Sequence, residues 1–130
     1  MDAAVVHSTG GPEALVLEDI PTPSPGPAEV GVDVSAAGVN YIDVYHRTGK
    51  YPLPTPFIAG SEGAGVVREV GADVDQFAVG DRVTWAMVPG AGYAQQVLVP
   101  AARLVPVPPD IDEETAAGGV GLLLTQVAAA

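Results

Sequence analysis

The stretch from residue 40 to residue 62 carries most of the side chains that could take part in chemistry. A phenol can donate to a carbonyl oxygen, and a carboxylate that lacks a partner can carry a proton. These residue types permit proton transfer on a small molecule, as in an isomerase or a cyclase. The side chains of this stretch that we consider as candidates are Asn40, Asp43, Tyr45, Tyr51 and Glu62, with Arg47 and Ser61 beside them, and their catalytic roles depend on the resemblance described below.

Several of these residues also have a purely structural interpretation. Asn40 is a good N-cap for a short helix, a role that is compatible with a role in the site. Asp43 and Arg47 are four residues apart, and this spacing predicts a local ion pair on the helix surface. Glu62 could form an ion pair with Arg47 or with Arg68, and it would then carry no proton.

Other polar and aromatic residues near the candidates are assigned structural roles. The predicted helix turns His46 away from the candidate site, so we expect His46 at the surface. Trp85 and Met87 are expected to close the core rather than bind a ligand. Tyr45 and Tyr51 have packing at the rim of the site as their structural alternative.

Composition excludes several classes of function. The chain of 130 residues has 5 basic and 16 acidic residues, with a net charge of −11. This balance argues against nucleic acid and anionic membranes as partners, because phosphate binding needs clustered Lys and Arg. There is no cysteine, which excludes disulfides and thiolate ligands. His7 and His46 lie far apart, so we expect neither zinc nor another metal.

The N-terminus and the lengths of the apolar segments indicate the cellular location of the protein. The sequence begins MDAAVVHSTGG, without the basic and apolar regions of a signal peptide. The longest apolar stretch falls well short of the ~18 residues that a membrane span needs. We therefore expect a cytoplasmic protein.

The elements that must position the candidates are short strands. Proline at every second position from residue 21 to 27 predicts an extended connector, and 51–56 is a second proline-stiffened loop. A helix is predicted over 41–47, with Asn40 as N-cap and Gly49 at its end. Strands spaced like those of a small barrel are predicted over 2–7, 14–19, 29–36, 64–70, 92–99 and 103–107, and 79–83 is predicted as a turn followed by a strand.

The residue pattern of the C-terminal segment, 110–130, predicts a helix. Asp110 or Asp112 can cap it, and its glycines predict a break at Gly118 and Gly119. From Val120 onward the predicted helix carries apolar residues on most of its faces, so it must be buried. We therefore expect a homodimer formed through the site cleft and the C-terminal helix.

Six separate stretches carry a family resemblance. They are GGPEAL (10–15), AAGVNYIDVYHRTGKYP (36–52), GSEGAGVVREVG (60–71), VGDRV (79–83), GYAQQVLVP (92–100) and LVPVPPDID (104–112). In order and spacing the chain resembles the N-terminal domain of zinc-independent, zeta-crystallin-like quinone oxidoreductases of the medium-chain dehydrogenase/reductase superfamily. The resemblance implies a mainly β fold with short helices, a GroES-like partly open β-barrel over residues 1–115, followed by a C-terminal helix.

The resemblance also implies roles for particular residues. Asn40 matches the family asparagine whose amide faces the nicotinamide or the substrate oxygen, and Tyr45 and Tyr51 match aromatics of the same cleft. Zinc-dependent relatives have a cysteine in place of Asn40 and a His-Glu pair in place of Ser61 and Glu62. Ser61 and Arg47 are therefore expected in the substrate cleft.

Residues 116–130 resemble the start of a nucleotide-binding domain. They read Ala-x-Gly-x-x-Gly and then an apolar helix, so that Gly118, Gly119 and Gly121 resemble a cofactor-binding loop. In the family this loop follows a buried strand, whereas here it follows the segment 108–115. The resemblance thus implies an internal deletion near 115–117 and a remnant of the glycine motif.

Three hypotheses follow for function. The first is a truncated quinone oxidoreductase whose parent reaction is NADPH-dependent reduction of quinones or enones, and which binds no NADPH and lacks full redox activity alone. The second is a free-standing domain recruited for non-redox proton transfer. The third is a small-molecule binding or dimerisation module without chemistry.

Overall fold

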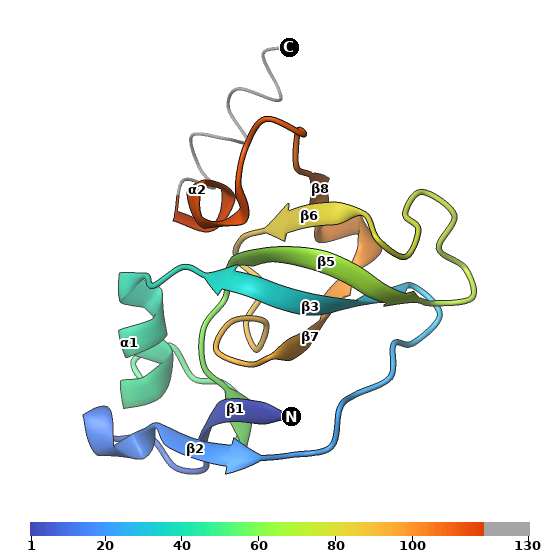
Figure 1. Cartoon of the computed structure of the whole chain (residues 1–130). Helices are drawn as coiled ribbons and strands as arrows, with labels where there is room; N and C mark the ends of the chain where they lie inside the picture. The colour runs from blue at the N-terminus through green and yellow to red at the C-terminus, as the bar shows by residue number, and fades with distance from the viewer. Residues whose placement is uncertain (119–130) are drawn as a thin grey trace.

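The computed structural model describes residues 1–118, and it consists of two antiparallel sheets and two short helices (Figure 1). The smaller sheet has the order β2-β1-β4, and the larger has the order β7-β3-β5-β6-β8. The strands are β1 Asp2–Val6, β2 Val16–Asp19, β3 Glu29–Ala37, β4 Phe57–Ile58, β5 Gly63–Val70, β6 Arg82–Trp85, β7 Gln96–Pro100 and β8 Val105–Pro106. The helices are α1 Tyr41–Thr48 and α2 Glu113–Gly118, with single 3-10 turns η1 Pro12–Ala14 and η2 Ala101–Arg103.

The large sheet encloses the main core, as the alternating valines of β3 predict. Val30 and Val32 are fully buried, and Val34 packs partly against the same cluster. Trp85 is 1% exposed and donates its indole N–H to the carbonyl oxygen of Ala91 at 2.7 Å. The predicted mainly β, partly open barrel and the structural role of Trp85 are confirmed.

Some boundaries differ from the prediction. The expected hairpin of the N-terminal strands is present, but β2 begins only at Val16, because Pro12–Ala14 form η1. The strand expected over 92–99 begins at Gln96. Met87 was expected to close the core, and this was wrong: it is 59% exposed and its φ is 57°.

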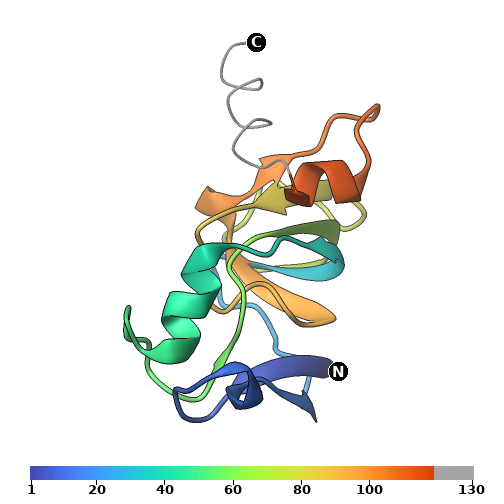
Figure 2. The same cartoon turned by 90° about the vertical axis from the view of Figure 1, so that its left-hand side faces the viewer.

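Helix α1 lies at one side of the molecule (Figure 1). Figure 2 shows it between the β1–β2 hairpin and the end of the large sheet, with α2 at the far end of the molecule. Asn40 precedes α1 in an extended conformation, and Gly49 ends it with φ 86°, a left-handed value that suits glycine. Both ends of the helix therefore lie where the sequence predicted them.

Helix α2 is fastened to the barrel through Arg82 on β6. The Arg82 Nε donates to Glu113 at 3.0 Å, and the terminal nitrogens donate to the carbonyl oxygens of Pro108 and Ile111. The hydrogen bond from Arg82 lowers the pKa of Glu113. Asp112 caps the helix by accepting the N–H of Thr115 at 2.7 Å, as one of the two predicted caps.

Small side chains fill the space beneath α2. Ala116 and Ala117 pack with Ala64 and Val107 in a second, smaller core cluster. The expected break at Gly118 and Gly119, the helix from Val120 onward and the loop residue Gly121 lie outside the described residues, except for Gly118 as the last residue of α2. No helix in the described part of the chain is long and apolar enough to cross a membrane.

Candidate functional site

The site is built at the N-terminal end of α1. The Asp43 carboxylate accepts the backbone N–H of Asn40 at 3.0 Å, and the N–H of Asp43 donates to the carbonyl oxygen of Asn40 at 3.0 Å. These two bonds close the first turn of the helix. The side-chain N–H groups of Asn40 donate to no protein atom within residues 1–118, so they remain available to a ligand.

Asp43 is the centre of a buried hydrogen-bond network. It is 7% exposed, and its carboxylate accepts the Tyr93 hydroxyl at 2.6 Å and the Ser61 hydroxyl at 3.3 Å in addition to the N–H of Asn40. The expected Asp43–Arg47 ion pair is absent among the described residues, and that prediction was wrong. The carboxylate of Asp43 instead accepts hydrogen bonds from Ser61 and Tyr93, which are distant in sequence.

Two glycines bring these distant donors together. The backbones of Gly60 and Gly92 cross so closely that a Cβ on Gly92 would lie 2.4 Å from the Gly60 Cα. Gly60 has φ 91°, and the crossing sets Ser61 and Tyr93, the residues that follow the two glycines, against Asp43. The main chain of Tyr93 is held as well, since its N–H donates to Ala59 and its carbonyl accepts from Ala4, both at 2.8 Å.

Tyr93 is a site residue that sequence reasoning did not single out. Burial, and then the hydrogen bond to Asp43, raise the pKa of the Tyr93 phenol well above its usual value. The phenol therefore stays protonated and its proton is committed to Asp43. The only signal in the sequence was its place after Gly92 in the stretch GYAQQVLVP.

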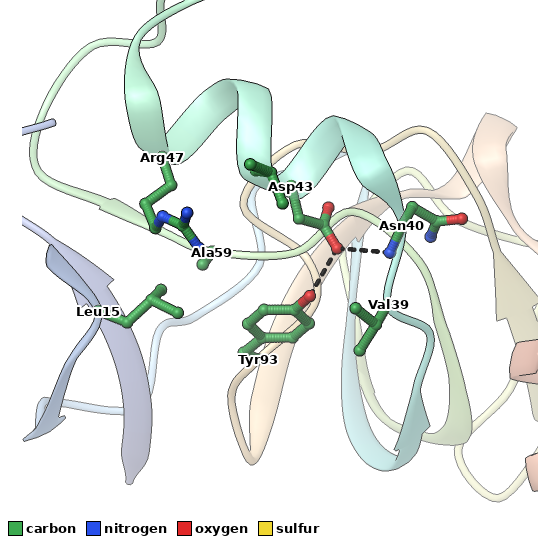
Figure 3. Close-up of a pocket in the computed structure, with 8 residues that line it drawn as sticks. Leu15, Val39, Asn40, Asp43, Arg47, Ala59 and Tyr93 are labelled. Atoms are coloured by element: carbon green, nitrogen blue, oxygen red, sulfur yellow. Dashed lines mark hydrogen bonds between the residues drawn. The ribbon is translucent and has the colours of Figure 1, made fainter. Parts of the chain in front are cut away.

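A pocket of about 270 Å³ opens beside this network (Figure 3). In Figure 3 Arg47 lies at one end, Asn40 lies at the other, and Asp43 and Tyr93 lie between them. The rest of the wall is apolar and comes from Leu15, Val39, Val44 and Ala59. The pocket thus offers an amide, a buried carboxylate and a guanidinium around an apolar space.

Arg47 is held at its end of the pocket by the β1–η1 loop. Its Nε donates to the carbonyl oxygen of Gly10 at 3.4 Å, and its own carbonyl accepts the N–H of Gly10 at 3.0 Å. No carboxylate of the described residues lies within ion-pair distance of the Arg47 guanidinium. Its charge is therefore not neutralised by a direct protein partner in this part of the chain.

Tyr45 and Tyr51 do not line this pocket. They pack edge to face at 5.2 Å between ring centroids, and Tyr41 packs against Tyr45 at 6.0 Å. The Lys50 ammonium lies 4.5 Å from the centre of the Tyr45 ring. These rings form an aromatic cluster on a second face of α1, and Tyr41 and Tyr51 are exposed there.

Glu62 also lies apart from the pocket. Its side chain lies against the Cα of Gly38, where a Cβ would overlap with it. Of the two alternatives for Glu62, the ion pair with Arg47 or Arg68 is absent among the described residues, and Arg68 lies 3.8 Å from both Asp33 and Glu69. The pairing of Asp43 with Arg47 therefore needs correction, whereas Glu62 follows the alternative without an ion pair among the described residues.

His46 was expected at the surface, and this was wrong. It is 7% exposed, because it lies on the side of α1 that is buried together with Asp43. Residues 1–118 bring together no group of three or more His, Cys, Asp and Glu side chains that could hold a metal ion.

Comparison with known proteins identifies relatives of the chain. A family model of the alcohol dehydrogenase GroES-like domain matches residues 26–109. The chain is similar to a 2-haloacrylate reductase from Burkholderia sp, with 45% identity over 85% of this chain and 34% of that protein. It is also similar to a quinone oxidoreductase from Pseudomonas aeruginosa, with 47% identity over 83% of this chain and 34% of the relative.

Solved structures agree with these matches. The crystal structure of Escherichia coli quinone oxidoreductase complexed with NADPH superposes with a TM-score of 0.87 and 35% identity, over 90% of this chain and 36% of that one. The chain spans about a third of the length of the curated relatives that it matches.

Proposed function

Because the chain belongs to the alcohol dehydrogenase GroES-like domain family, with quinone oxidoreductases among its relatives, we propose that it forms the substrate-binding part of an NADPH-dependent, zinc-independent reductase. Its substrates would be quinones or small conjugated carbonyl compounds. The observation that carries this proposal is the Asn40 amide at the pocket. Its N–H donors have no protein partner within residues 1–118, and Asp43 fixes the helix end that carries it.

Each part of the site has a distinct task in this proposal. When bound, NADPH supplies a hydride to the substrate. The Asn40 amide N–H donates to the substrate oxygen on which negative charge develops, and a fixed donor of this kind stabilises that charge. Asp43 holds the helix end in place rather than moving a proton, because its oxygens already accept three hydrogen bonds. Tyr45 and Tyr51 lie outside the pocket, and in this proposal they form the aromatic rim of the wider substrate cleft.

The described residues do not fit a dinucleotide by themselves. Pyrophosphate is commonly held by amide groups at the start of a helix that follows a parallel strand. Every strand pair formed within residues 1–118 is antiparallel, and Gly119 and Gly121 lie outside the described residues. We propose that residues 1–115 form the catalytic-type domain, that 116–130 belong to a cofactor domain, and that this chain alone binds no NADPH.

Incubation of the chain with NADPH and 1,4-naphthoquinone is expected to give no NADPH oxidation above the protein-free rate. The same quinone is nevertheless expected to shift the amide NMR signals of α1, and Asn40→Ala should weaken that binding. Saturable NADPH oxidation by the chain would overturn the proposed lack of activity. Binding that is unchanged in Asn40→Ala would remove the assigned role of the amide and favour a non-redox binding module.

We also propose the homodimer that the sequence predicts through the site cleft and the C-terminal helix, and the described residues that support it lie around α1. Val39, Tyr41 and Tyr51 are 81%, 79% and 49% exposed, so that apolar and aromatic surface collects around this helix. Light scattering at micromolar concentration is expected to give twice the monomer mass, and Tyr41→Glu should shift the chain toward the monomer. A monomeric mass for the unaltered chain would contradict the dimer.

A further inference from the structure

Arg47 stands apart from the other four basic residues of the chain. Arg68 and Arg82 lie within ion-pair distance of carboxylates, and Arg103 donates to two backbone carbonyls. Lys50 lies over a tyrosine ring. Arg47 alone among the five lines the pocket, and its terminal nitrogens have no hydrogen-bond partner within residues 1–118.

From this arrangement we infer that the pocket takes an enone or quinone that carries a carboxylate, with the carboxylate bound by Arg47. The inference rests on the proposed function and names its substrate class. The planar guanidinium presents parallel N–H donors that match the two oxygens of a carboxylate, which a single ammonium does not. The carbonyl of the same molecule then lies toward Asn40 at the other end of the pocket.

The apolar wall suits the carbon chain between these two ends. Leu15, Val44 and Ala59 line the pocket together with the Tyr93 ring, and they offer no further charge to the ligand. A volume of about 270 Å³ is small, so a short chain fits better than a large fused ring system. The pocket therefore selects for charge at one end and for a hydrogen-bond acceptor at the other.

The negative charge of Asp43 does not block an anion here. Its carboxylate is buried and already accepts three hydrogen bonds, from Asn40, Ser61 and Tyr93. The net charge of −11 repels anions at long range. Salt screens that repulsion beyond about 8 Å at physiological ionic strength. A carboxylate in contact with Arg47 is well inside that distance.

The test compares (E)-4-oxopent-2-enoate with its uncharged amide, by following the Arg47 Nε–H signal and the α1 amides in NMR titrations without cofactor. The acid is expected to bind at least about tenfold more tightly than the amide, since a hydrogen bond to a charged group contributes that much or more. Arg47→Gln should reduce the affinity for the acid to that for the amide, and Arg47→Lys should give an intermediate value.

Arg68→Gln is the matched control, because it removes the same charge from a residue outside the pocket, and it should leave both affinities unchanged. Equal binding of acid and amide would overturn the inference, as would tight binding of the acid by Arg47→Gln. If Arg47→Gln fails to fold, the acid–amide comparison on the unaltered chain and the Arg47→Lys variant decide. The titrations measure binding without cofactor. They can therefore confirm carboxylate binding by Arg47 even if the proposed reductase function is wrong.

Discussion

Replacing Asp43 with alanine is expected to lower the free energy of unfolding by about 3–5 kcal/mol. The substitution leaves the hydroxyls of Ser61 and Tyr93 and the N–H of Asn40 without their acceptor. Each hydrogen bond to a charged group contributes about 1.5–3 kcal/mol, while removal of the buried carboxylate relieves its desolvation and offsets part of the loss. Urea denaturation followed by circular dichroism measures the difference.

Two further variants make this result specific to the network. Tyr93→Phe removes one of the three donors and should cost less, about 1.5–3 kcal/mol. Glu69→Ala removes an exposed carboxylate that lies 3.8 Å from Arg68. This change should alter stability by less than about 1 kcal/mol, because exposed ion pairs contribute little. If Asp43→Ala were as stable as Glu69→Ala, the network would not hold the site together.

Alanine at Gly92 is expected to destabilise the fold by about 3 kcal/mol and to separate Ser61 and Tyr93 from Asp43. The new Cβ would lie 2.4 Å from the Cα of Gly60 and 2.5 Å from its carbonyl carbon. These are main-chain atoms that no rotamer change can move, so the two crossing segments have to part. Thermal unfolding measures the loss of stability. The NMR signals of the Tyr93 side chain report whether its hydroxyl has separated from Asp43.

Gly60 and Gly80 distinguish steric overlap from backbone strain. Gly60→Ala combines a Cβ at 2.8 Å from Gly92 with a left-handed φ of 91°, whereas Gly80→Ala has φ 96° and no atom within 4 Å of the Cβ. Gly80→Ala should therefore cost only the strain, about 1–2 kcal/mol, and it should leave Tyr93 in place. Equal losses at Gly80 and Gly92 would show that the crossing is not tightly packed.

Local features of the site were predictable because they depend on neighbouring residues. The placement of α1 between Asn40 and Gly49 follows from capping preferences, and the buried valines of β3 follow from their alternation. The same reasoning from neighbouring residues gave a wrong prediction for Asp43 and Arg47, which do not form an ion pair. An i,i+4 pair is favourable in an isolated helix, but a buried carboxylate takes the donors that the tertiary fold places around it.

The distant half of the site could not be predicted from spacing. Tyr93 is 50 residues from Asp43, and its approach depends on the crossing of Gly60 and Gly92, which no periodicity encodes. His46 was misplaced for a related reason. The sequence of a short helix does not say which of its sides is buried by the rest of the fold, and here the buried side includes both His46 and Asp43.

The attachment of α2 to the barrel also gives the molecule a mechanical anchor. Arg82 extends from β6, in the interior of the large sheet, and grips the segment 108–113 at two carbonyls and one carboxylate. The guanidinium therefore adds, to the packing of Ala116 and Ala117, a polar attachment of this segment to a strand with partners on both sides. The covalent chain leads from α2 back to the edge strand β8, so this attachment to β6 lets an interior strand share a load that would otherwise fall on the edge strand alone.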